Sequence, residues 1–118
     1  MGDYQELIAW QKAMDLAQEV YACTQGLPKE EIYGLTSQIR RAAVSIPSNL
    51  AEGASRAGPK EFMQFLHIAR GSASELETQL LLAERIGYAS GGKELLAKLA
   101  GVKQLINGLI RSLKDKTQ

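Results

Sequence analysis

Few residues in this chain of 118 are of the types that bind metals or act as catalytic bases and nucleophiles. His67 is the only histidine and Cys23 the only cysteine, which is too small a set of nitrogen and sulfur ligands for a zinc site. Helical di-metal enzymes use the pattern Glu-x-x-His, and Gln64 stands where His67 would need a glutamate. We therefore predict no metal site and no cofactor.

Nucleophilic and phosphate-binding motifs are also missing from the sequence. Serines are frequent, but no Gly-x-Ser-x-Gly motif of a hydrolase nucleophile occurs. Residues 70–74, Arg-Gly-Ser-Ala-Ser, lack the Gly-Lys-Ser/Thr ending of a phosphate-binding loop. Glu52 and Glu75 could be paired acids, but salt bridges with Arg41 or Arg70 explain them better. We predict no catalytic residue, no small-molecule substrate and no enzymatic activity.

The charges of the sequence nearly cancel, giving a net charge of +1. They are unevenly distributed, since residues 36–60 hold four basic side chains and one acidic one, and residues 93–118 hold six and two. Residues 1–35 have the opposite excess, with two basic and six acidic side chains. A balanced total can therefore conceal a basic face that attracts nucleic acid, although solvated helix surface is the simpler explanation of any one block.

The sequence also indicates where the protein resides. No apolar run approaches the ~20 residues that a membrane-spanning helix needs. Residues 1–11 lack the basic start and apolar block of a secretion signal, and a single cysteine cannot form an internal disulfide. We expect a cytoplasmic protein that makes no membrane contact.

Apolar residues recur with heptad-like spacing in four segments, which is typical of amphipathic helices. The four apolar sets are Leu7, Trp10, Met14, Ala17, Tyr21 and Thr24; Ile32, Leu35, Ile39, Ala42, Ala43, Ile46 and Leu50; Phe62, Phe65, Leu66, Ala69, Ala73, Leu76, Leu80 and Ala83; and Leu95, Leu99, Val102, Ile106, Leu109 and Leu113. We predict helices over roughly 4–25, 29–56, 59–87 and 91–115 in a single domain, 1–118. Because short connections make consecutive helices antiparallel, the predicted fold is all-α, an antiparallel up-down-up-down four-helix bundle.

The second predicted helix has three distinct sides at about 3.6 residues per turn. The side expected to face the core consists of Ile39, Ala43, Ile46 and Leu50. A second side is polar, and a third is small and mostly apolar. Pro47 lies on this third side and lacks an N–H, so we predict a kink near Pro47. The bend either wraps the helix around the core or shapes a surface for a partner.

Apolar residues outside the core stripes of the second and third helices favour a homo-oligomer, although they could instead cover a loop within the subunit. The residues that we expect in the oligomer interface are Val44, Pro47, Ala51, Met63, Leu81 and Leu82. We also expect a polar network formed by Gln38, Arg41, Asn49, Glu52, Ser72 and Glu75.

Two segments, residues 33–53 (YGLTSQIRRAAVSIPSNLAEG) and residues 65–80 (FLHIARGSASELETQL), resemble the two motifs of the bacterial four helix bundle protein family. Its members are also known as 23S ribosomal RNA intervening-sequence proteins. The resemblance covers roughly residues 5–90. It implies an antiparallel four-helix bundle that assembles as a ring-like homopentamer, and no enzymatic activity follows from it. A related branch, the accessory variability determinant of diversity-generating retroelements, binds nucleic acid and a reverse transcriptase through basic residues.

Two functions remain open from the sequence. In the first, the protein is an oligomeric scaffold that binds structured RNA or DNA through phosphate contacts of its basic residues. The residues expected to make these contacts are Arg40, Arg41, Arg56, Lys60 and Arg70. In the second, the oligomer is structural or binds another protein, and its arginines form salt bridges between subunits. Glu52, Glu75 and Glu77 would then be their partners.

Overall fold

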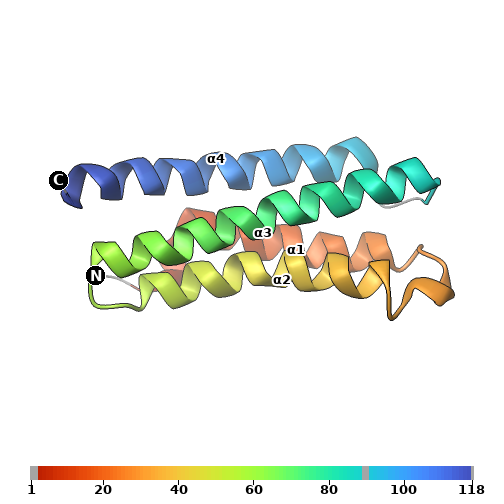
Figure 1. Ribbon diagram of the computed structural model, residues 1–118, viewed down its shortest axis with the longest axis horizontal. Coiled ribbons are helices and arrows are strands. Elements are labelled where there is room, and N and C mark those ends of the chain that lie inside the picture. The colour runs from red at the N-terminus through yellow and green to blue at the C-terminus, as the bar shows by residue number, and fades with distance from the viewer. Residues whose placement is uncertain (1–2, 89–90, 118) are drawn as a thin grey trace.

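The computed structural model describes residues 3–88 and 91–117. Within these ranges the chain forms two short 3-10 turns, η1 (Tyr4–Glu6) and η2 (Lys29–Glu31), and four α-helices. The helices are α1 (Ile8–Thr24), α2 (Leu35–Ala54), α3 (Pro59–Ile86) and α4 (Gly92–Thr117). Each helix packs against the one that follows it, and α4 returns to contact α1. The predicted all-α, up-down four-helix bundle is confirmed (Figure 1).

The bundle is long and narrow, with extents of 47 × 19 × 19 Å, and both chain termini lie at the same end in Figure 1. Its core is one cluster of buried apolar side chains drawn from all four helices. The predicted core side of α2 is confirmed, because Ile39, Ala43, Ile46 and Leu50 are each at most 1% exposed. The stripe of α4 is also buried, except that Leu109 is half-buried and Ile110 takes part instead.

The apolar set of the first helix is placed differently from the other sets. Of its six residues only Ala17 and Thr24 are buried, whereas Met14 is 44% and Tyr21 43% exposed. The buried face of α1 consists of Ala9, Ala13, Leu16, Ala17, Val20 and Thr24. This helix therefore has two adjacent apolar stripes. The stripe of smaller side chains enters the core, where the neighbouring helices approach closely, and the aromatic stripe lies along the edge next to α2.

Helix α2 is shorter than predicted, because it begins at Leu35 rather than near residue 29. The chain leaves Pro28 in the single 3-10 turn η2 and passes through Gly34, whose φ and ψ are −115° and −113°. The Glu31 carboxylate accepts a hydrogen bond from the Leu35 amide at 3.1 Å. This carboxylate occupies the place of an N-cap side chain, so the helix starts there.

Helices α2 and α3 approach each other closely at Gly53. A Cβ atom on Gly53 would lie 2.7 Å from Phe65 Cβ and 2.9 Å from Phe62 Cδ1. Pro47 is buried within α2, and the helix continues beyond it to Ala54. The kink near Pro47 remains a prediction. None of the described helices is both long and apolar enough to cross a membrane.

Candidate interaction surfaces

An apolar groove of about 550 Å³ runs along the outer edge between α1 and α2. We call it the α1/α2 groove, and its lining residues are Tyr4, Trp10, Met14, Ala17, Gln18, Tyr21, Val44, Pro47, Ser48 and Ala51. Three of the predicted interface residues, Val44, Pro47 and Ala51, form its α2 wall. The α1 wall comes from the aromatic stripe, in which Trp10 packs edge-on against Tyr4 with ring centroids 5.4 Å apart. Helical periodicity identifies these aromatic residues as one stripe of α1, but it does not show that they lie opposite α2.

Arg40 contacts the groove residue Tyr21 and links α2 to the C-terminal turn of α1. Its Nε donates to Thr24 Oγ1 at 2.9 Å, and its Nη2 donates to the Tyr21 carbonyl at 3.4 Å. The guanidinium also lies over the Tyr21 ring, 4.7 Å from the centroid. A cation at the C-terminal end of a helix bonds carbonyls that lack intrahelical donors. The Arg40 side chain thus bonds groups of its own subunit, whereas the sequence predicted that it contacts phosphate.

The polar network is smaller than predicted and is centred on Ser45. The Ser45 and Ser72 hydroxyls are 2.8 Å apart across the α2–α3 contact. Asn49 donates to both the carbonyl and the hydroxyl of Ser45, at 2.8 and 3.0 Å. Asn49 and Ser72 therefore meet as expected, through a residue that the prediction omitted.

The four other predicted members of the network are exposed and lie outside it. Glu52 pairs with Arg56 at 3.6 Å rather than with Arg41, because these residues are four apart on one helix. Among the described residues, the side chains of Gln38, Arg41 and Glu75 have no hydrogen-bond or ion-pair partner. These three side chains are therefore available to solvent or to another molecule.

The remaining basic residues differ in how firmly they are held. The Arg56 guanidinium contacts Glu52 and lies 5.1 Å from the Phe65 ring centroid. Arg70 donates to Asn107 on α4 at 3.2 Å and to Nδ1 of His67 at 2.9 Å. Lys60 is exposed beside a shallow hollow that Lys116 also lines. Within the part of the chain that the structure describes, Arg41 and Lys60 are the two predicted phosphate contacts without an internal partner.

The three predicted interface residues on α3 point in different directions. Met63 is half-buried and packs against the core. Leu81 is 46% exposed and lies one turn after Glu77, which bonds Lys103 of α4 at 3.1 Å, so it is on the α4 side. Leu82 is 47% exposed and, as the next residue of the helix, points about 100° away from Leu81. The predicted interface is thus divided between the α1/α2 groove and two outer edges of α3.

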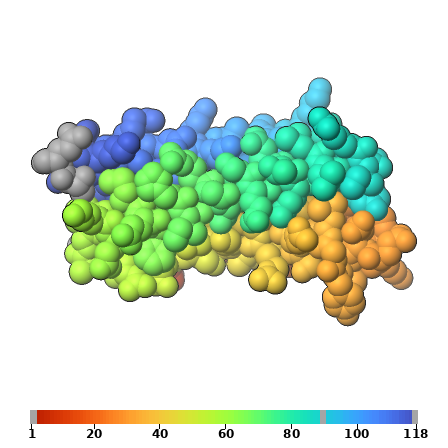
Figure 2. All heavy atoms as spheres, in the orientation of Figure 1, coloured from red at the N-terminus to blue at the C-terminus, as the bar shows by residue number. Residues whose placement is uncertain are grey.

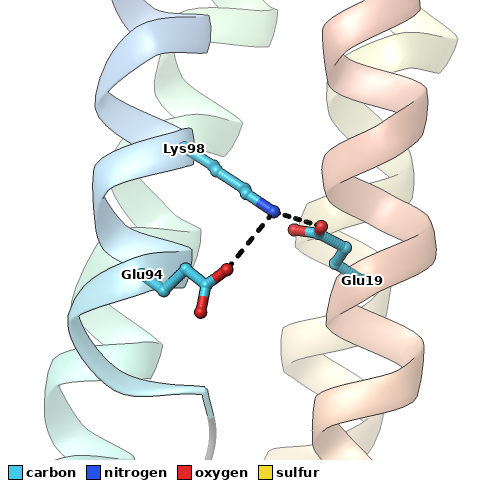
Figure 3. A network of polar contacts seen from close by, with 3 residues as sticks. All are labelled: Glu19, Glu94 and Lys98. Carbon is cyan, nitrogen blue, oxygen red and sulfur yellow. Dashed lines mark hydrogen bonds and ion pairs between the residues drawn. The ribbon is translucent and has the colours of Figure 1, made fainter.

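A second hollow, of about 720 Å³, follows the seam between α1 and α4. Lys98 of α4 spans this seam to the Glu19 carboxylate of α1 and also approaches Glu94 at 3.8 Å (Figure 3). The bond to Glu19 raises the pKa of the Lys98 ammonium above its usual value, and the nearby Glu94 charge adds to this. The i,i+4 spacing of Glu94 and Lys98 on α4 is a signal in the sequence that the prediction did not use, whereas no helical spacing relates Lys98 to Glu19 of α1.

Tyr88 ties the end of α3 to the start of α2. Its hydroxyl donates to Glu31 Oε2 at 2.9 Å, while Glu31 Oε1 holds the Leu35 amide. The bond to Glu31 raises the pKa of the Tyr88 phenol above 10.0, and partial desolvation raises it further. The same Glu31 side chain therefore organises two connections of the bundle.

We predict that Tyr88 ionises above pH 10, and that Glu31→Ala moves this transition to lower pH because the main cause of the shift is removed. The pKa is higher in the folded state, so the stability contributed by the bond is present below the unfolded pKa and is lost as pH rises through the folded pKa. Phenolate absorbance, measured as the difference between the wild type and Tyr88→Phe, reports this transition. A midpoint that stays unchanged in Glu31→Ala contradicts the prediction.

The side chains that could bind metals are dispersed. His67 is exposed and Cys23 is half-buried. In residues 3–88 and 91–117, no three His, Cys, Asp or Glu side chains gather closely enough to hold a metal ion.

Comparison with known proteins identifies the chain by its family. The family model described as 23S rRNA-intervening sequence protein matches residues 5–108, which is most of the sequence. No curated protein gave a match. The family comprises small helical proteins without known catalytic activity. The two motifs, the four-helix bundle and this match agree, and the chain belongs to the 23S rRNA-intervening sequence protein family.

Proposed function

We propose that the protein is a non-enzymatic subunit of a homo-oligomeric scaffold. The observation that carries this proposal is the exposed α1/α2 groove, which presents aromatic and aliphatic side chains to water. A contiguous exposed apolar surface with a polar rim is typical of a site that contacts another molecule. Met14, Tyr21 and Val44 of this groove are each more than 40% exposed, so the subunit itself does not cover them.

The exposed apolar residues lie on different sides of the bundle, which favours a head-to-tail contact over a two-fold one. In a two-fold dimer the same patch meets itself, whereas a head-to-tail contact joins two different patches and can close into a ring. The α1/α2 groove is one such patch, and α3 carries others at Leu81 and Leu82. The family resemblance suggests five subunits, and a five-membered ring requires two different patches of this kind.

Replacing Val44 with Lys tests the proposal directly. Val44 is 41% exposed in the subunit, so a lysine is tolerated there in a monomer. In the oligomer it places an unpaired charge in an apolar contact, and we expect assembly to weaken by at least about tenfold. Mass measured by light scattering should fall toward 12.9 kDa. Gln104→Lys, at an exposed position of α4, is the matched control and should keep the wild-type mass.

A second candidate function is binding of structured RNA or DNA by this oligomer. It is supported by the family description, which refers to 23S rRNA, and by Arg41 and Lys60, which are exposed and have no internal partner among the described residues. Repetition around a ring would multiply a weak phosphate-binding site into a stronger one. Because Arg40 is engaged with α1, the phosphate contacts are assigned to Arg41, Arg56 and Lys60.

For this second function we predict binding that weakens steeply between about 50 and 200 mM salt, since phosphate contacts release counterions. The double variant Arg41→Glu/Lys60→Glu should bind labelled structured RNA at least about tenfold more weakly, and Lys93→Glu should bind as the wild type does. Fluorescence anisotropy measures both. Absence of binding at low salt would leave the protein-interaction scaffold, in which Arg41 bonds carboxylates such as Glu75 of a neighbouring subunit.

A further inference from the structure

An exposed apolar cluster lies at the end of the bundle that carries the α1–α2 connection. Tyr33 is 96% exposed and Ile32 is 54% exposed, just before α2 begins. Figure 2 shows the orange part of the chain, which includes this connection, projecting beyond the neighbouring surface. A tyrosine buries about 150–250 Å² when it is packed, so leaving this ring in water forgoes a large apolar contact.

The last turns of α3 expose two more apolar side chains at this end of the bundle. Leu82 is 47% and Ile86 51% exposed. The bond between Tyr88 and Glu31 brings this end of α3 to the α1–α2 connection. We call Ile32, Tyr33, Leu82 and Ile86 the end patch.

The end patch is held in place before any partner arrives. Glu31 bonds the Leu35 amide at 3.1 Å and the Tyr88 hydroxyl at 2.9 Å, and the Gly34 amide donates to the Glu31 carbonyl at 2.9 Å. A Cβ atom on Gly34 would lie 2.9 Å from Glu31 Oε1, so this turn is closely packed. Binding through a preorganised segment loses little conformational entropy.

We propose that the end patch of one copy docks into the α1/α2 groove of a second copy, with Tyr33 as the anchoring side chain. This inference rests on the homo-oligomer proposed above and names the contact that builds it. The groove volume of about 550 Å³ is within the range of about 300–1,000 Å³ that accommodates a drug-sized ligand. It therefore has room for the Tyr33 ring and an adjacent aliphatic side chain.

Charge complementarity favours a second copy as the occupant. Glu30 is exposed next to the end patch. Arg41 precedes the groove residue Val44 by three positions on α2, which places an exposed cation at the groove rim. The two parts of the chain that carry these surfaces also differ in charge. Residues 1–35 have an excess of acidic side chains, and residues 36–60 have an excess of basic ones. Glu30 beside the anchor can thus pair with Arg41 beside the groove of the second copy.

The two surfaces do not meet within one subunit, because Tyr33 is 96% exposed there. Each copy therefore offers one anchor and one groove to different neighbours, which is a head-to-tail contact. Tyr33 alone supplies roughly a fifth of the ~800 Å² that each partner buries in a standard interface. The rest of the end patch and the groove rim enlarge this contact.

The test measures assembly by analytical ultracentrifugation for Tyr33→Ser and Tyr33→Phe. Loss of the anchor should weaken the contact between subunits by about 30-fold or more, as for an interface hot spot. Tyr33→Phe keeps the ring and should assemble as the wild type does. Because Tyr33 makes no contact inside the subunit, the far-ultraviolet circular dichroism of both variants should match the wild type.

Mixing the anchor variant with the groove variant isolates a single contact. Tyr33→Ser retains its groove and Val44→Lys retains its end patch, so an equimolar mixture should form a 1:1 dimer of twice the subunit mass. If Tyr33→Ser assembles as the wild type does, or if the mixture stays monomeric, the proposed contact is wrong. Neither result contradicts the homo-oligomer itself. A wild type that is monomeric at every concentration overturns the homo-oligomer as well.

Discussion

Replacing Leu66 with Ala is expected to lower the free energy of unfolding by about 2–5 kcal/mol. Leu66 of α3 is fully buried at the centre of the bundle and contributes to the one apolar core. Removing its isopropyl end loses the transfer free energy of three carbon atoms and leaves a cavity that the surrounding helices fill only in part. A domain of this size is stable by roughly 5–15 kcal/mol, so the variant loses a large share of its stability.

The matched control for Leu66→Ala is Gln64→Ala, an exposed position on the same helix. This change should alter stability by less than about 0.5 kcal/mol. Urea unfolding at one fixed protein concentration measures both variants, because oligomerisation makes apparent stability depend on concentration. Equal effects of the two substitutions would mean that the core is not centred on this face of α3.

Replacing Gly53 with Ala is expected to destabilise the protein by about 1–3 kcal/mol, although alanine is the better helix former. The added Cβ meets Phe65 Cβ at 2.7 Å and Phe62 Cδ1 at 2.9 Å, and the first of these atoms is fixed to the backbone of α3. The two helices must therefore separate at their closest point, which weakens the packing along the whole α2–α3 contact.

Replacing Gly71, another glycine within a helix, with Ala is expected to have the opposite effect on stability. A Cβ atom at Gly71 meets nothing within 4 Å, so only the gain in helix propensity remains. We expect an increase in stability of about 0.5–1 kcal/mol. Thermal unfolding should give shifts of opposite sign for the two variants, and shifts of the same sign would contradict the close approach at Gly53.

The sequence was sufficient to predict the bundle and the core faces of α2 and α4, because each of these helices has one dominant apolar stripe. It was misleading for α1, where Trp10, Met14 and Tyr21 made the larger stripe more conspicuous than the buried stripe of Ala13 and Leu16. Periodicity identifies apolar faces but does not tell which of two adjacent faces enters the core. That choice depends on how closely the neighbouring helices approach.

The candidate site was predicted only in part, since it is built from contacts between helices. Val44, Pro47 and Ala51 were recognised as an unusual apolar side, but their position opposite the aromatic stripe of α1 needed the structure. Arg40 had the residue type of a phosphate contact, yet Thr24 and Tyr21 hold it within the subunit. Helical spacing relates residues of one helix and carries no information about such partners.

The mass of the wild-type protein in solution tests most directly whether the subunit assembles with copies of itself. Sedimentation equilibrium should give a mass several times 12.9 kDa, with five times that value expected from the family resemblance. The mass should hold over a wide range of protein concentration. A mass of 12.9 kDa at every protein concentration from nanomolar to high micromolar would contradict self-assembly.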